Sequence, residues 1–236
     1  MKENIYTIPI NDAFSADCEC PICEFFNIEE HSRIEYALGA SMMEPDERIV
    51  SNEKGYCRRH TQMMYDFGNK LSHALVLETR LRYLIDNISK YKKEHKKPKK
   101  IIFGKDQHHQ TPLKYSATCM ICERLDDVLD KFIANLFYLY KKDDEFKKKF
   151  FSSKGFCITH FELLANSAYR HLSPDEGYDF VNKLCELETE NLNRVLGDVE
   201  WFTKKFDYRY KNEDWKNSKD AVIRGGTKIS ELIVEK

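Results

Sequence analysis

The chain has 236 residues, 42% of them hydrophobic and 13% aromatic, so it is long enough and apolar enough to bury a core rather than stay disordered. Its 38 basic and 39 acidic side chains nearly cancel, which argues against a general attraction to nucleic acid or to an anionic membrane. The N-terminal residues lack the apolar core of a secretory signal and no apolar run is long enough to span a bilayer, so we expect a cytoplasmic protein without a membrane partner.

The eight cysteines of a protein in a reducing compartment favour metal ligation or thiol chemistry over a disulfide framework. Six of them belong to two matched motifs that lie 99 or 100 residues apart and mark an internal repeat. The first motif consists of residues 20–23 (Cys-Pro-Ile-Cys) and residues 54–60 (Lys-Gly-Tyr-Cys-Arg-Arg-His). A glycine directly before the aromatic–cysteine pair permits the turn that aims the cysteine inward before a helix begins.

Two helices are predicted within and after this first motif. Residues 44–47 (Glu-Pro-Asp-Glu) place acidic side chains where a helix N-terminus favours them. From Met64 onward, apolar residues at mostly three- and four-residue steps predict a second helix, and these residues are Phe67, Leu71, Leu75, Leu81, Leu84 and Ile88.

Residues 90–100 contain seven lysines, which repel one another and cannot build a core. No aromatic residues alternate with these lysines as stacking on single-stranded nucleic acid would require. We therefore interpret them as the solvated end of a helix that runs into a polar linker. The adjacent histidines, His108 and His109, are interpreted as part of the same linker rather than as metal ligands.

The second motif consists of residues 119–122 (Cys-Met-Ile-Cys) and residues 154–160 (Lys-Gly-Phe-Cys-Ile-Thr-His), with a helical apolar stripe over 125–140 between them. A further helix begins at residues 173–176 (Ser-Pro-Asp-Glu), where serine and glutamate form a capping box and proline suits the first turn. Cys185 lies in the stripe of that helix and is expected to be a small buried side chain. The aromatic and basic residues of 201–221 suit either an interface with protein or single-stranded nucleic acid, or packing back over the helices, and both interpretations stay open.

Each repeat supplies three thiolates and one imidazole, a ligand set typical of a closed structural zinc site. We expect two Zn²⁺ ions, with the ligands grouped within each repeat. An iron–sulfur cluster is the alternative, because Cys18 adds a thiol close to the first C-x-x-C. The simpler interpretation of Cys18 is a spare thiol that binds no metal. Metal-free thiol chemistry is a third possibility. The two predicted groups are Cys20, Cys23, Cys57 and His60, and Cys119, Cys122, Cys157 and His160.

The duplicated motifs, together with residues 215–221 (Trp-Lys-Asn-Ser-Lys-Asp-Ala), resemble an uncharacterised family of bacterial and archaeal cytoplasmic proteins that carry C-P-x-C and G-[FY]-C-x-x-H twice. The resemblance covers nearly the whole chain. The second C-x-x-C departs from the C-P-x-C pattern, because it has Met120 where the first has Pro21. This difference leaves the ligands unaffected. The resemblance implies one integrated architecture and supplies no reaction, substrate or partner.

We expect an all-α fold, a helical bundle of two metal-clamped repeats with an aromatic-rich C-terminal extension. The predicted parts are a first repeat over 1–92, a basic linker over 93–114, a second repeat over 115–206 and an extension over 207–236. No Ser-His-Asp order, phosphate-binding glycine loop or H-E-x-x-H helix is present, so no catalytic residue is predicted. The leading hypothesis is a zinc-binding interaction or regulatory module with a protein partner. The alternative is a redox- or metal-responsive protein, and nucleic-acid binding ranks below both.

Overall fold

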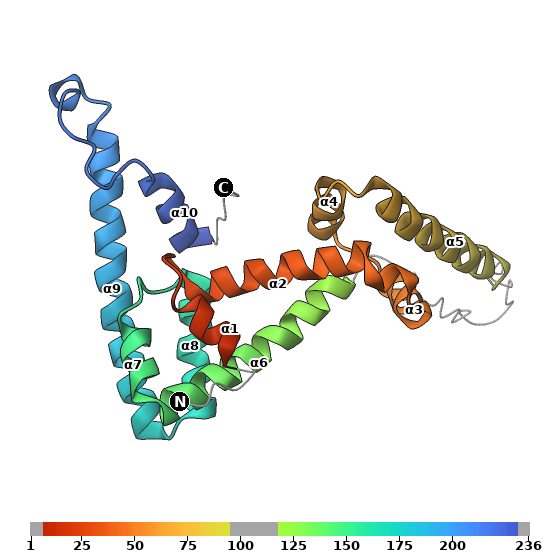
Figure 1. Ribbon diagram of the computed structural model, residues 1–236, viewed down its shortest axis with the longest axis horizontal. Helices are drawn as coiled ribbons and strands as arrows, with labels where there is room; N and C mark the ends of the chain where they lie inside the picture. The colour runs from red at the N-terminus through yellow and green to blue at the C-terminus, as the bar shows by residue number, and fades with distance from the viewer. Residues whose placement is uncertain (1–6, 95–117, 231–236) are drawn as a thin grey trace, which may run out of the picture. The chain divides into compact units, whose positions relative to one another are not determined.

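The structure is a computed structural model that describes residues 7–94 and 118–230, and every regular element in these two ranges is a helix (Figure 1). The all-α prediction is confirmed. Most of the predicted linker over 93–114, with His108 and His109, lies outside the described residues. None of the described helices combines the length and the apolar character that crossing a bilayer requires.

The chain divides into two compact units. Unit 1 contains Met1–Ile28 and Val128–Lys236, and unit 2 contains Glu29–Asp127. The boundaries fall inside two long helices, α2 (Pro21–Leu38) and α6 (Met120–Lys142). Each unit therefore combines residues from both predicted repeats.

Unit 1 is built around buried aromatic rings. Phe150 lies at the centre of this cluster, with its ring centroid 5.4 Å from that of Phe14, 5.2 Å from Phe156 and 5.5 Å from Phe180. Aromatic pairs at such separations add to the stabilisation that burial provides. The helices of this unit, besides parts of α2 and α6, are α1 (Ile8–Ala13), α7 (Asp144–Phe151), α8 (Ile158–His171), α9 (Pro174–Lys204), the 3₁₀ turn η2 (Tyr208–Tyr210) and α10 (Ala221–Ser230).

The helix α9 begins as its sequence predicts. The Ser173 hydroxyl accepts the backbone N–H of Glu176, and the Glu176 carboxylate accepts the backbone N–H of Ser173. This capping box satisfies two backbone donors that the helix itself leaves without partners. The prediction that Cys185 is buried is wrong, because its side chain is exposed while Leu184 and Leu187 are buried. One residue along a helix turns a side chain by about 100°, which carries Cys185 off the buried face.

The aromatic C-terminal segment packs back on the end of α9. The indole N–H of Trp201 donates to the backbone oxygen of Asp214 over 3.0 Å, and the ring of Trp215 lies 5.7 Å from that of Phe202. The helix α10 then packs along α9 and α8. Of the two interpretations that the sequence left open, packing over the helices describes both tryptophans.

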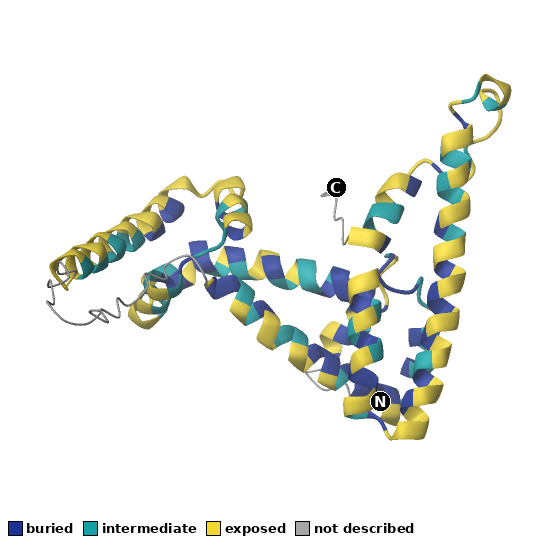
Figure 2. Ribbon diagram, turned by 180° about the vertical axis from the view of Figure 1, so that it is seen from behind, coloured by how far each residue is buried: buried dark blue, intermediate teal, exposed yellow. Residues whose placement is uncertain are grey.

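Unit 2 has a smaller core, whose buried apolar side chains are Ile34, Ala37, Leu38, Met64, Val76, Met120, Ile121 and Leu125. Its own elements are η1 (Ala40–Met43), α3 (Pro45–Lys54), α4 (Arg58–Asp66) and α5 (Lys70–Glu94). The stripe predicted from Met64 to Ile88 forms two helices rather than one, because Gly68 adopts a positive φ of 89° between α4 and α5. Figure 2 shows α5 as largely exposed along its length.

Candidate metal centres

The structure gathers the eight predicted ligands into two groups, and the ligand atoms of each group lie within 4.8 Å of one another. Each group contains three thiols and one imidazole and could hold one metal ion. All eight cysteines of the chain are free thiols, with no disulfide. We call the group in unit 1 site 1 and the group in unit 2 site 2, and they are Cys20, Cys23, Cys157 and His160 (site 1) and Cys57, His60, Cys119 and Cys122 (site 2).

The predicted grouping within each repeat is therefore wrong. The C-x-x-C of each repeat meets the C-x-x-H of the other repeat. The lengths of the helices explain this exchange. The helix α2 has 18 residues and spans about 27 Å, whereas the next α-helix, α3, has 10 residues and spans about 15 Å. The helix α6 has 23 residues and spans about 35 Å, and α7, which follows, has 8 residues and spans about 12 Å. In neither repeat is the helix that follows long enough to carry the C-x-x-H back to its own C-x-x-C.

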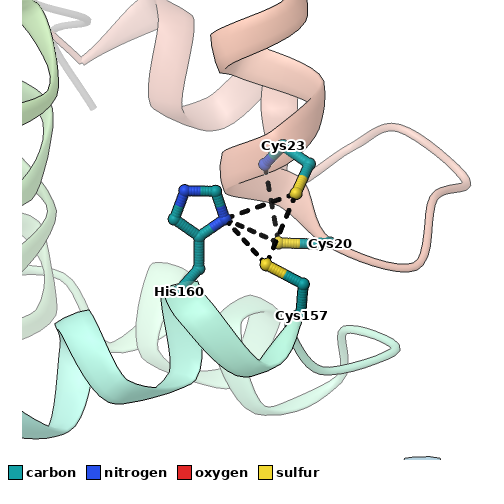
Figure 3. Close-up of side chains that lie close together, drawn as sticks. All are labelled: Cys20, Cys23, Cys157 and His160. Carbon is teal, nitrogen blue, oxygen red and sulfur yellow. Dashed lines mark hydrogen bonds between the residues drawn. The ribbon is translucent and has the colours of Figure 1, made fainter. Parts of the chain in front are cut away.

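Site 1 joins the start of α2 to the start of α8, and its three sulfurs and one imidazole nitrogen point toward a common centre (Figure 3). The Nδ1 atom of His160 lies 3.5 Å from the sulfur of Cys20, 3.3 Å from that of Cys23 and 3.1 Å from that of Cys157. All four side chains are buried. Site 1 is thus a closed set of donors, and its three cysteines belong to the same buried cluster as the aromatic rings of unit 1.

The loop before Cys157 takes the conformation that its sequence predicts. Gly155 adopts a φ of 77°, a region that side-chain-bearing residues rarely occupy. Cys157 is then the N-cap of α8, so His160 lies one turn into that helix, on the face of Cys157. Gly55, with a φ of 70°, and the N-cap residue Cys57 repeat this arrangement in unit 2.

A buried ion pair supports the loop of site 1. The ammonium of Lys228, on α10, donates to the backbone oxygens of Lys154 (2.6 Å) and Phe156 (3.1 Å) and lies 3.4 Å from the carboxylate of Glu188. Glu188 in turn accepts the backbone N–H of Phe156 over 2.7 Å. Lys228 is only 1% exposed, so its charge depends on these partners for compensation.

Site 2 joins the start of α4 to the start of α6. The Nδ1 atom of His60 lies 3.2 Å from the sulfurs of Cys57 and Cys119 and 3.4 Å from that of Cys122. Cys57 and Cys122 are half-buried, in contrast to the fully buried thiols of site 1. The guanidinium of Arg80, on α5, donates to the backbone oxygens of Asn52 and Glu53 just before Gly55, much as Lys228 braces the other loop.

A buried carboxylate orients the imidazole of site 2. The Nε2 atom of His60 donates to Glu30 over 2.9 Å, and Arg59 donates to the other oxygen of Glu30 over 2.6 Å. Since Nδ1 faces the thiols, this hydrogen bond selects, in the neutral ring that can bind a metal, the tautomer in which Nδ1 carries a free lone pair. Carboxylate partners of this kind fix the ring and raise the basicity of a metal-ligating histidine.

The donors of site 2 ionise unequally in the absence of a cation. Burial disfavours the Cys119 thiolate, but hydrogen bonds from His60 and from the backbone outweigh burial and lower the pKa of Cys119 to about 6. Burial and the neighbouring Cys119 raise the pKa of Cys122 to about 12. Burial lowers the pKa of His60, but hydrogen bonds to Cys119 and Glu30 prevail and raise it to about 10.

Site 1 shows the same inequality. Burial opposes ionisation of Cys20, but hydrogen bonds from Cys157 and Cys23 prevail and lower its pKa. Hydrogen bonds to Cys157 and Cys20, followed by burial, raise the pKa of Cys23. Three thiols this close cannot all carry negative charge unless a cation compensates them, so the donor set fits a divalent ion.

Sequence reasoning missed four residues that support these sites, namely Glu30, Arg80, Glu188 and Lys228. Each lies on a helix far from the motif it contacts, and no local pattern distinguishes it from a surface charge. Cys18 lies outside both ligand groups. Burial and the nearby Cys20 and Glu24 raise its pKa to about 12, so it is a protonated thiol.

The model of a family of unknown function, DUF6062, matches residues 1–236 of the chain, which therefore belongs to that family. No curated protein and no solved structure matches the chain. The ligand geometry is accordingly the main guide to function.

The exchange of motifs between repeats predicts a particular metal stoichiometry. The double variant Cys23→Ser/Cys157→Ser damages site 1 twice and should keep one metal equivalent per chain. Cys23→Ser/Cys57→Ser damages both sites and should keep none. Elemental analysis of the two purified variants, with each single variant as a control, distinguishes the groupings. One equivalent in Cys23→Ser/Cys57→Ser and none in Cys23→Ser/Cys157→Ser would instead support ligands grouped within each repeat.

The Glu30–His60 hydrogen bond predicts a loss of metal affinity at site 2 only. Removing the charge in Glu30→Gln should weaken binding there by about 10- to 100-fold. Competition between cobalt-loaded protein and a chelator measures this, with site 1 of the same molecule as an internal reference. Glu29→Gln, on the same helix but paired with Arg33 over 2.9 Å, is the matched control. Equal weakening at both sites would show that Glu30 does not act through His60.

The Lys228–Glu188 pair predicts a large change in stability. Lys228→Met leaves a buried carboxylate without its cation and should lower the free energy of unfolding by about 3–5 kcal/mol. Adding Glu188→Gln should recover part of this loss, because a neutral amide still accepts the Phe156 N–H. Denaturant unfolding measures both effects, with the exposed Lys219→Met as the control. A loss no greater than that of Lys219→Met would contradict the role of this pair.

Proposed function

We propose that this DUF6062 member is a zinc-binding helical protein in which two structural Zn²⁺ ions hold the helices in place, and that it serves as an interaction module for a protein partner. The two Cys₃His groups carry the first half of the proposal. The exposed face of α5 carries the second half.

The distances between the ligand atoms support a single ion in each site. With Zn–S bonds of about 2.3 Å and Zn–N bonds of about 2.05 Å, a tetrahedron places two sulfurs about 3.8 Å apart and a sulfur and nitrogen about 3.6 Å apart. The sulfur pairs Cys57–Cys122 and Cys23–Cys157 are 3.8 and 3.6 Å apart, and the sulfur–nitrogen distances in the two sites run from 3.1 to 3.5 Å. An iron–sulfur cluster spreads its four protein ligands over two or four iron atoms, so the whole ligand set needs wider spacing than a single ion does.

A structural role for the ions is favoured by the closed ligand sets. Catalytic zinc keeps one coordination position for water or substrate, and here four protein donors fill a tetrahedron. Two cavities, of about 510 and 430 Å³, lie elsewhere in unit 1 and are lined by none of the eight ligands. These cavities therefore give a substrate no path to either ion.

Elemental analysis of untagged protein tests the metal assignment. We expect two zinc equivalents per chain and a colourless sample, because zinc has no visible transitions. Removing zinc with a chelator should raise hydrogen exchange more in unit 2, whose apolar core is the smaller. A brown protein with visible absorption after anaerobic purification would replace zinc by iron. A metal-free chain that keeps its full stability would refute the proposal.

The helix α5 presents an apolar face that no other described element covers. Its buried side, which includes Val76, packs toward α3. Four residues at i, i+4, i+8 and i+11 form a stripe on the other side, with exposures of 43, 57, 61 and 52%. A stripe with this spacing suits a second helix rather than a strand or an extended peptide. We call these residues the α5 stripe, and they are Leu77, Leu81, Ile85 and Ile88.

The charge of α5 specifies the partner further. The helix carries six basic and three acidic side chains, and Lys90, Lys92 and Lys93 crowd its C-terminal end. A second copy of the same helix would bring like charges together. An amphipathic helix of another protein, with acidic residues beside its own apolar face, complements both the stripe and the charge.

A labelled synthetic peptide tests this surface directly. Its leucines follow helical three- and four-residue spacing and its other positions are mainly glutamate, and a scrambled peptide of equal composition serves as control. Fluorescence anisotropy should show saturable binding to the patterned peptide only. Leu81→Ser/Ile85→Ser should weaken binding at least about tenfold, because two buried aliphatic contacts are lost. The exposed Leu196→Ser on α9 should leave binding unchanged.

Two other outcomes would overturn the α5 proposal. Binding of anionic phospholipid vesicles, abolished by Leu81→Ser/Ile85→Ser without any binding of the peptide, would assign the stripe to a membrane surface. A dimer in sedimentation equilibrium that the same variant dissociates would assign it to a second copy of the chain.

A further inference from the structure

The two sites contain equivalent pairs of thiols. In each site, the second cysteine of the C-x-x-C lies beside the cysteine of the C-x-x-H. The sulfurs of Cys122 and Cys57 are 3.8 Å apart in site 2, and those of Cys23 and Cys157 are 3.6 Å apart in site 1. The chain therefore holds the same arrangement twice, which allows a comparison inside one molecule.

Burial separates the two pairs. Cys57 and Cys122 are both half-buried, whereas Cys23 is 6% and Cys157 0% exposed. In unit 1, Phe156 directly precedes Cys157, and its ring is fully buried and packs on Phe150. In unit 2, half-buried Tyr56 takes the place of Phe156, and the two arginines after Cys57 are exposed. A small oxidant in solution can thus reach only the pair of site 2.

Neither remaining thiol outside the sites offers such a pair. Cys185 is exposed, but it is not among the ligand groups and has no adjacent thiol partner among the described contacts. Cys18 is half-buried and belongs to neither ligand group. Accessible thiols that face each other from different segments therefore occur at Cys57 and Cys122.

We propose that Cys57 and Cys122 are a hydroperoxide-reactive pair whose oxidation to a disulfide releases the ion of site 2, while site 1 keeps its ion. This inference rests on the proposed zinc sites. It turns one of two similar structural ions into an exchangeable one. The difference between the sites lies in the access of solvent to their sulfurs.

The chemistry balances with hydrogen peroxide as the oxidant. The thiolate of one cysteine attacks a peroxide oxygen, so an S–O bond forms, the O–O bond breaks and hydroxide leaves. The second thiolate attacks the resulting sulfenic sulfur, so an S–S bond forms, the S–O bond breaks and a second hydroxide leaves. Two electrons pass from the two sulfurs to the peroxide, and the two hydroxides take up protons from solvent.

The geometry requires only a short movement. The sulfurs must close from 3.8 Å to the disulfide length of about 2.05 Å. Once they are bonded to each other, only Cys119 and His60 remain as donors of site 2. Two ligands do not hold zinc in a structural site, so the ion leaves.

Zinc release under hydrogen peroxide tests this inference. The zinc-loaded protein is treated with peroxide in the presence of a chromogenic chelator, and its disulfides are mapped by mass spectrometry without reduction. We expect one of the two equivalents to leave at least about tenfold faster than the other. A single disulfide between Cys57 and Cys122 should appear with it, and a thiol reductant with added zinc should reverse both changes.

The variants Cys122→Ser and Cys23→Ser are a matched pair, because each removes the same position from one site. The chain with Cys23→Ser should keep the fast release and the disulfide, and the chain with Cys122→Ser should lose both. If Cys122→Ser fails to fold, the disulfide map of the unmodified chain still decides the question.

Three results distinguish the possible failures. Two zinc equivalents that leave at equal rates, or a disulfide between Cys23 and Cys157, would overturn the inference and leave the zinc sites standing. Two zinc equivalents that both stay bound under peroxide would likewise overturn the inference and leave the zinc sites standing. A protein that contains no zinc before treatment would refute the proposed function itself.

Discussion

At each Cys₃His group a C-x-x-C segment meets a C-x-x-H segment from a distant part of the chain, and the rest of this structure depends on that convergence. In each unit, one ligand pair opens a long helix and the other opens a helix from a distant part of the sequence. The rigidity of α2 and α6 forces this pairing, because each helix carries the chain farther than the helix after it can return. A metal ion at either group would close a long loop of chain, which is the situation in which a cross-link constrains the unfolded state most.

The two sites perform the same task in different surroundings. The cysteines of site 1 belong to an aromatic-rich core, and the buried Lys228–Glu188 pair holds Phe156 beside Cys157, so the unit has several independent sources of stability. Site 2 lies in a unit with few buried apolar side chains and has two half-buried thiols. Its histidine is held by Glu30, an arrangement typical of a finely oriented metal ligand. The same duplicated motif thus supports a well-buried centre and a more accessible one.

Unit 2 also carries the surface that we propose as a docking site. The α5 stripe has the spacing of a helix-binding face, and α5 is held on α3 by Arg48, which donates to the Thr79 hydroxyl and the Leu75 carbonyl. The same helix supplies Arg80 to the last turn of α3, just before the loop that leads to Cys57. A change at site 2 is therefore linked to α5 through one short loop. This connection gives the proposed oxidation of site 2 a direct route to the proposed docking surface.

The sequence alone determined which eight side chains form the two groups, the all-helical class, the turns at Gly55 and Gly155 and the capping box of α9, because each of these depends on neighbours within a few positions. Only the tertiary structure decided which C-x-x-C meets which C-x-x-H, because that depends on the lengths of the helices between these segments. It also decided that Cys185 is exposed and that Lys228 is buried. The contacts that Glu30 makes with His60 and Glu188 with Phe156 were likewise decided by the tertiary structure. Burial and long-range contacts arise when helices pack, and no local pattern around these residues specifies the surface against which they will lie.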